Sequence, residues 1–201
     1  MMPTYTYDNF SRHIPVWEEH LLKRAEQLKK GKINILDIGC GEGASTLWFL
    51  NNLALGQYAR VYSCDQWNQK ETEIKFNINI AEDPASHKVV KLKGPIINEM
   101  NKVAIGLQTS HYQKFNVIYV NCTTQSLEAL TIMLNAFYLL RDDGFMIINN
   151  ANAKHTINLL GGQAVHYKEA INTFLRLTVM RTEVLYHENQ LIVKKLFMSS
   201  L

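Results

Sequence analysis

The chain has 201 residues, of which 47% are hydrophobic and 19% charged, with a formal net charge of +3. These values are typical of one globular domain with a proper core, and the mild charge, carried in pairs such as Lys29-Lys30 and Lys194-Lys195, indicates solvated surface rather than a nucleic-acid-binding face. Three cysteines without paired spacing argue against disulfides and zinc, and no apolar run reaches the roughly 20 residues that span a bilayer. We therefore expect a cytoplasmic protein without a membrane partner.

The predicted elements begin with an extension over residues 1–15 and a helix over residues 16–30, which ends in a basic turn and a glycine. Short apolar strands then alternate with helices. Strands are predicted at 33–38, 60–64, 88–93, 115–120 and 145–148, and helices at 45–53, 96–107, 126–140 and 167–177. Two further β segments, 182–187 and 190–197, are joined by the turn Glu188-Asn189.

This order of elements predicts a doubly wound α/β fold. Alternating strands and helices build a parallel sheet with helices on both faces, and two strands joined by two residues must pair antiparallel. We expect a Rossmann-like, mostly parallel sheet of seven strands with an antiparallel C-terminal hairpin. Residues 31–201 are expected to form a single domain, with residues 1–30 as an N-terminal extension and helix that pack on it.

The first strand runs into a glycine-rich loop, Gly39-Cys40-Gly41-Glu42-Gly43, that precedes a helix. Glycines let the backbone turn sharply and approach a ligand closely, and the start of the helix directs N–H groups toward the same crevice. Ligands of open α/β sheets bind at the carboxyl ends of the strands. Asp65 closes the second strand at this edge, where it could bind ribose hydroxyls.

Two cofactor classes fit this loop. With Ala44 it satisfies the dinucleotide pattern G-x-G-x-x-G/A, and Asp65 would serve either class. The other class is represented by S-adenosylmethionine (SAM). Asp37, two residues before the first glycine, favours SAM over a dinucleotide, because a carboxylate repels a pyrophosphate but suits the sulfonium and ammonium of SAM. A plainer interpretation is that the glycines only make a tight turn and that Asp37 caps the next helix.

The stretch from Asp37 to Thr46 resembles motif I of the class I SAM-dependent methyltransferases. With His13-Ile14-Pro15-Val16-Trp17, Gly43 to Trp48, Tyr119-Val120-Asn121 and Leu139 to Gly144, the chain is similar to the small methyltransferase domain 24 family over residues 10 to 197. The resemblance implies that the methionine part of the cofactor lies along Asp37, Gly39, Gly41 and Gly43. It implies that the adenosine lies by Asp65, Gln66, Trp67 and Gly94. Asn121 would face the methyl group and the substrate.

The chain departs from this family at two strand ends. The family usually shows Asp-Gly-Ser-His after strand four and Asp-Asp after strand five, where this chain has Asn121-Cys122-Thr123-Thr124 and Asn149-Asn150. In related catechol-type enzymes, acids at such positions hold a divalent metal. Because hard cations prefer carboxylate oxygens, no tight Mg²⁺ or Ca²⁺ site is expected at these asparagines.

The expected activity is methyl transfer from SAM to a hydroxyl or amine of a small molecule, without a metal, with S-adenosylhomocysteine (SAH) as product. Such an enzyme mainly aligns the reacting atoms, but the acceptor must lose a proton. Candidate bases are His155 and His166, in a segment with Gly161-Gly162 that could act as a lid. Alternatives are a cofactor-binding protein without catalysis and, more weakly, an NAD(P)-dependent oxidoreductase. The oligomeric state stays open, a homodimer included.

Overall fold

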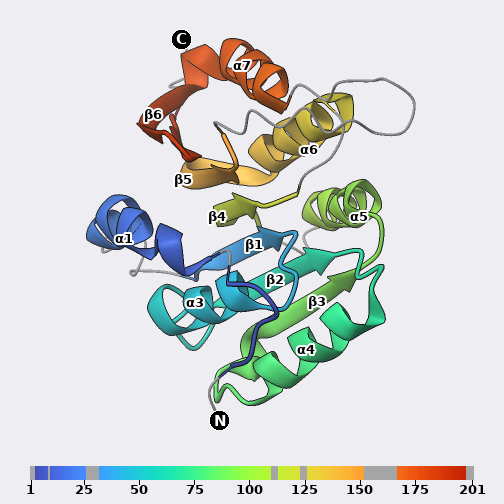
Figure 1. Ribbon diagram of the computed structural model, residues 1–201. Helices are drawn as coiled ribbons and strands as arrows, with labels where there is room; N and C mark the ends of the chain where they lie inside the picture. Colours follow the sequence, from blue (N-terminus) through green and yellow to red (C-terminus); the bar gives the residue numbers. More distant parts are fainter. Residues whose placement is uncertain are drawn as a thin grey trace.

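The computed structural model describes residues 3–8, 10–25, 32–109, 113–122, 126–151 and 167–197. In this part of the chain, seven strands form one sheet in the order β3-β2-β1-β4-β5-β7-β6 (Figure 1). The strands are β1 (Asn34–Ile38), β2 (Arg60–Asp65), β3 (Val89–Lys93), β4 (Phe115–Val120), β5 (Leu140–Asn149), β6 (Thr182–His187) and β7 (Gln190–Lys195). The first five strands run parallel, and β7 pairs antiparallel with β5 and β6. The predicted mixed sheet is confirmed.

Helices cover both faces of this sheet. They are α1 (Ile14–Trp17), α2 (Lys23–Ala25), α3 (Ala44–Asn52), α4 (Lys70–Ala81), α5 (Ile96–Gln108), α6 (Ser126–Leu139) and α7 (Tyr167–Thr178). One core cluster joins the sheet to α1, α3 and α4, and the other joins it to α5, α6 and α7 (Figure 1). None of the described helices combines the length and apolarity that a bilayer crossing requires.

The N-terminal helical segment begins earlier than predicted. A 3₁₀ turn at Ser11–His13 leads into α1, and a π-helical turn at Glu18–Leu22 connects α1 to α2. Trp17 is fully buried, with its ring edge-on to Tyr119 and stacked on Phe49. The segment is therefore held against the sheet by aromatic packing.

Helix α4 has no counterpart among the predicted elements. Its apolar residues alternate at Ile74, Phe76, Ile78 and Ile80, which is the pattern of a half-buried strand. In the structure, Phe76 and Ile80 are buried one helical turn apart, while Ile74 and Ile78 are exposed. The connection between parallel strands β2 and β3 must cross the sheet, and a helix is its usual form. Topology thus overrides the local pattern.

Strand β5 starts five residues before its predicted first residue. Leu140 already pairs with Phe115, and the register between the two strands then shifts. Asp143 takes a left-handed conformation, with φ +61°. The polar stretch Arg141 to Gly144, which predicts a helix stop, is therefore an irregular part of the strand.

Lys195 contradicts the prediction that the Lys194-Lys195 pair lies on solvated surface. It is 2% exposed, and its ammonium donates to the carbonyl oxygens of Phe137 (2.8 Å) and Leu140 (2.7 Å). It also lies 4.7 Å from the centre of the Phe137 ring. The last carbonyls of α6 lack helical partners, and this buried cation satisfies them. Lys194 stays partly exposed and pairs with Asp143 at 2.9 Å.

Replacing Lys195 with methionine is expected to lower the free energy of unfolding by about 2–4 kcal/mol, because two buried carbonyl groups lose charged donors. Urea unfolding followed by circular dichroism measures this. Lys194→Met is the matched control, with an expected cost below about 1 kcal/mol, since its ion pair is a surface one. Equal losses in the two variants would contradict the assigned role of Lys195.

Candidate functional site

The glycine loop lies at the carboxyl ends of three neighbouring strands. Gly39 donates its N–H to Cys64 O of β2, and Asn121 donates its N–H to Ile38 O, each at 2.8 Å. Gly39 has φ +76°, and a Cβ there would lie 2.2 Å from the Asn121 carbonyl oxygen. Only glycine fits between β1 and the end of β4, so this residue sets the position of the loop.

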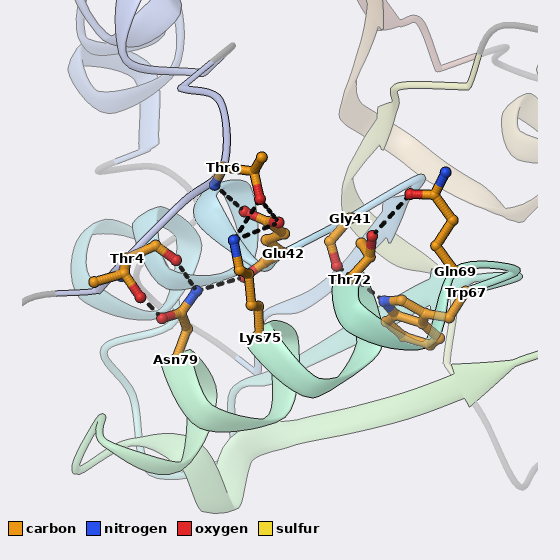
Figure 2. A network of polar contacts seen from close by, with 9 residues as sticks. All are labelled: Thr4, Thr6, Gly41, Glu42, Trp67, Gln69, Thr72, Lys75 and Asn79. Carbon is orange, nitrogen blue, oxygen red and sulfur yellow. Dashed lines mark hydrogen bonds and ion pairs between the residues drawn. The ribbon is translucent and has the colours of Figure 1, made fainter.

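Asp65 and Trp67 hold the middle of the loop. The Asp65 carboxylate accepts the N–H of Gly41 and the N–H of Trp67, both at 2.9 Å. The Trp67 indole N–H in turn donates to Gly41 O at 2.9 Å (Figure 2). A Cβ on Gly41 would meet no atom within 4 Å, so its exposed side faces open space. Asp65 and Trp67 thus hold one side of the loop by hydrogen bonds, and the other side of Gly41 is free for a ligand.

Asp37 is completely buried beneath the loop. One of its oxygens accepts the hydroxyls of Ser45 (2.8 Å) and Thr46 (2.6 Å), in the first turn of α3. The other oxygen is buried without a hydrogen-bond partner among the described residues. Burial raises the pKa of Asp37 to about 7, against the hydroxyl hydrogen bonds that lower it. The unpartnered oxygen can accept one further hydrogen bond, and because Asp37 is fully buried, a ligand donor such as an ammonium would reach it through water.

Asp37 does not cap the backbone of α3, contrary to the plainer interpretation of the sequence. It accepts hydrogen bonds from the hydroxyls of Ser45 and Thr46, and the N-cap residue of α3 is Gly43, without a side-chain cap hydrogen bond. Gly43 also packs closely, since a Cβ there would lie 3.2 Å from Phe76. A side chain at the first or third glycine would thus meet the packed chain, whereas one at Gly41 would meet open space, and both Gly39 and Gly41 line the same hollow.

Two hollows meet along this edge. The first, about 210 Å³, lies between the glycine loop and the N-terminal residues 5–7, and Ser45, Tyr119 and Asn121 also line it. The second, about 260 Å³, is lined by residues 65–69 and Thr72. Thr72 belongs to both linings. A ligand with an amino-acid end and a nucleoside end could occupy the two hollows together.

A chain of neutral amides runs behind the first hollow. The Trp17 indole N–H donates to Gln190, Gln190 to Asn149, and Asn149 to Asn121, at 2.8, 3.1 and 2.7 Å. Asn121 ends the chain on the carbonyl oxygen of Gly39 at 3.4 Å. The side-chain oxygens of Asn121 and Asn149 are thus engaged by amide donors, and the chain links the N-terminal helix to the glycine loop.

The predicted site residues come together only in part. Residues 37, 39, 41, 65 to 67 and 121 gather at one edge, and the Gly94 N–H, which donates to Asp65 O at 3.1 Å, lies beside them. Gln66 lines the second hollow. His155 and His166 lie outside the described residues. No described residue lining the first hollow is a histidine.

The sequence patterns did not predict that N-terminal residues line the first hollow, or that one face of α4 lies next to the loop and the N-terminal segment. Tyr5 and Thr6 line the hollow, and Thr72, Lys75 and Asn79 project from α4 toward the loop or the N-terminal segment (Figure 2). Glu42 stands at an x position of the pattern G-x-G-x-x-G/A, which specifies no residue type there. The polar spacing of Thr72, Lys75 and Asn79 is helical, and recognising α4 would have revealed it.

The family model of a methyltransferase domain matches residues 36–151, which is more than half of the chain. This chain belongs to that methyltransferase-domain family. The resemblance to the methyltransferase domain 24 family is thereby confirmed, and the family weighs against the nicotinamide-dependent alternative. No curated protein matches the chain significantly.

Solved structures share the fold of this methyltransferase-domain protein at low sequence identity. An O-methyltransferase from Bacillus cereus in complex with SAH has a TM-score of 0.70 at 15% identity, covering 96% of this chain and 84% of that one. The O-methyltransferase TomG from Streptomyces achromogenes, in complex with SAM, has a TM-score of 0.65 at 14% identity, with 88% and 78% covered. The methyltransferase MycE, in complex with Mg, SAH and mycinamycin VI, has a TM-score of 0.64 at 14% identity, with 94% and 51% covered.

One of these neighbours, MycE, is in complex with Mg. Within the described part of this methyltransferase-domain protein, no three acidic, histidine or cysteine residues lie close enough together to hold a metal ion. At the ends of β4 and β5, amide side chains occupy the edge instead.

Proposed function

We propose that this protein binds SAM at the glycine loop and transfers its methyl group to a small molecule. The carrying observation is the joint position of three groups at one edge: the clamped Gly41, the Asp65 carboxylate and the unpartnered oxygen of Asp37. They suit a nucleoside ribose at one end and a cationic amino-acid tail at the other. The SAM and SAH complexes of TomG and the Bacillus cereus enzyme support this cofactor.

Each residue of the site would then contact a different part of the cofactor. Asp65 holds the ribose hydroxyls, with Gln66 and Trp67 bordering the adenosine and Gly94 near the adenine. Asp37 neutralises the ammonium of the tail, and Gly39, Gly41 and Gly43 let the chain approach it. When bound, SAM supplies a methyl group already activated by a sulfonium. The protein's task is then alignment, for which the firmly bonded Asn121 at the end of β4 is placed.

We propose a hydroxyl or amine as acceptor, a hydroxyl being favoured by the O-methyltransferase neighbours. A proton must leave that acceptor, and His155 and His166 are the proposed bases. We further propose that transfer is independent of a metal. The oxygens of Asn121 and Asn149 already accept amide N–H groups, and neutral amides bring no charge to offset the dehydration of a hard cation.

Residues 31–201 are proposed to form the methyltransferase domain, with residues 1–30 packed against it. We propose a small-molecule partner, no nucleic acid and a cytoplasmic location. Mass photometry and size-exclusion chromatography would measure the oligomeric state, for which a homodimer is one outcome.

Isothermal titration with SAM and SAH tests cofactor binding, and release of labelled SAH over a panel of hydroxylated and amine acceptors tests transfer. We expect binding of both nucleosides, and turnover that neither EDTA nor added Mg²⁺ changes more than about twofold. Loss of turnover on EDTA treatment, with recovery on adding Mg²⁺, would contradict metal independence. Failure to bind either nucleoside would contradict the cofactor.

A cofactor-binding protein without catalysis is the second candidate. It is favoured by the amides at strand ends where the family usually carries acids. SAM and SAH would then bind with similar affinity and no acceptor would be methylated. Substituting His155 and His166 separately by alanine discriminates further, because an enzyme using either base loses turnover while keeping its affinity for SAM.

A further inference from the structure

The N-terminal segment of residues 3–8, here called the strap, passes over the glycine loop. It runs beside α3 and α4, far in sequence from the glycine loop (Figure 1). Its residues 5 to 7 line the first hollow opposite Gly39 and Gly41. The first hollow therefore lies between the strap and the glycine loop.

Glu42 of the loop holds the middle of the strap. Its two carboxylate oxygens accept the backbone N–H of Thr6 at 2.6 Å and the Thr6 hydroxyl at 2.5 Å. Lys75 of α4 pairs with Glu42 at 3.4 Å and also donates to the Thr6 hydroxyl oxygen (Figure 2). Burial opposes ionisation of Glu42, but the Thr6 and Lys75 contacts together lower its pKa, so it is a carboxylate at neutral pH.

Asn79 of α4 holds the start of the strap. Its side chain accepts the N–H of Thr4 at 3.1 Å and donates to Thr4 O at 3.2 Å, as a neighbouring strand would. The same amide nitrogen donates to Glu42 O at 2.9 Å. Asn79 is 3% exposed, so one buried side chain joins the strap, the loop and α4 (Figure 2).

Just beyond the strap, the chain is fixed by the apolar packing of Phe10. Phe10 is buried, with its ring edge-on to Trp17 at 4.8 Å and to Trp48 at 6.4 Å. The contacts of Thr4 and Thr6 are polar and partly exposed, whereas Tyr5 between them packs partly buried against the core cluster that contains Trp17 and Trp48. Water can replace such hydrogen bonds, whereas it cannot replace the aromatic packing. The strap can therefore open at Thr4 and Thr6 while it stays attached at Phe10.

We propose that the strap is a wall of the cofactor site, which encloses the amino-acid end of SAM or SAH and sets how fast it leaves. The inference rests on the proposed function. Residues 5 to 7 line the first hollow together with Gly39 and Gly41, so an amino-acid end held there lies between the strap and the loop. Asn79 and Glu42 act as positioning residues for the strap.

Asn79→Ala tests the inference, with Asn77→Ala as a matched control. Asn77 is exposed on the same helix and accepts a bond from Lys91 of β3, away from the strap. In stopped-flow displacement of SAH by excess SAM, followed by tryptophan fluorescence, we expect Asn79→Ala to release SAH at least tenfold faster than wild type. Asn77→Ala should stay within twofold. Thr6→Val, which removes only the hydroxyl, should accelerate release severalfold without risk to the fold.

Hydrogen exchange gives a readout that a purely structural role would not change. Bound SAH should slow exchange of the strap amides in wild type, and much less so in Asn79→Ala. Equal release rates in wild type, Asn79→Ala and Thr6→Val, with SAH bound by all three, would overturn the strap inference alone. If wild type bound neither SAM nor SAH, the proposed function would fall as well.

Discussion

Asp65→Ala is expected to weaken SAM binding by about 100-fold or more. A carboxylate that accepts two ribose hydroxyls contributes roughly 1.5–3 kcal/mol per hydrogen bond, and each 1.4 kcal/mol is a factor of ten in affinity. The substitution also frees the N–H of Gly41, which Asp65 now accepts at 2.9 Å. Isothermal titration at pH 7.5 measures the loss.

Two further variants separate these effects. Asp65→Asn keeps the shape of the side chain but not its charge, and should weaken binding less than Asp65→Ala. Glu71→Ala removes an exposed acid from α4 and should leave affinity within twofold of wild type. A wild-type affinity in Asp65→Ala would place the nucleoside elsewhere and reject the proposed site.

The affinity for SAM is expected to fall as pH drops from 7 to 5. Burial raises the pKa of Asp37 to about 7, so the free protein holds this carboxyl largely protonated below that pH. A cationic tail favours the ionised form, so binding releases a proton, and affinity changes by up to tenfold per pH unit. Titration in two buffers of different ionisation enthalpy measures the proton released.

Asp37→Asn should flatten this pH profile, because the amide does not titrate.

The raised pKa of Asp37 also predicts how the folding stability of the free protein depends on pH. Below pH 3.8, the ordinary carboxyl pKa, the group is neutral in both states. Between that value and about 7 the folded state retains a proton that the unfolded state loses, so stability declines as pH rises and then levels off. In the binding experiment, an affinity of the wild type for SAM that does not change with pH would contradict the proposed role of Asp37 at the cationic tail of SAM.

Pattern alone predicted the sheet well where burial and turn chemistry agree. The apolar run into Gly39 and the two-residue turn at Glu188-Asn189 each allow one local structure, and both are confirmed. Helix α4 is absent from the predicted elements because its apolar residues alternate along the chain, which is the pattern typical of a strand. Lys195 was misjudged because a lysine looks like surface until the carbonyls at the end of α6 are seen beside it.

The sequence by itself determined the family, the order of the strands along the chain, and the positions of Gly41 and Asp65 at one edge, because motif spacing and strand ends are local properties. Only the tertiary structure decided which distant side chains and which segment complete the edge of the sheet at the glycine loop. It brought Gln190 to Asn149 and Asn121, and residues 3–8 onto the glycine loop through Asn79. These contacts join residues up to 173 positions apart, as between Trp17 and Gln190, and no periodicity along the chain records them. They arise because folding places the ends of several segments at the same edge, where most buried polar groups pair with one another.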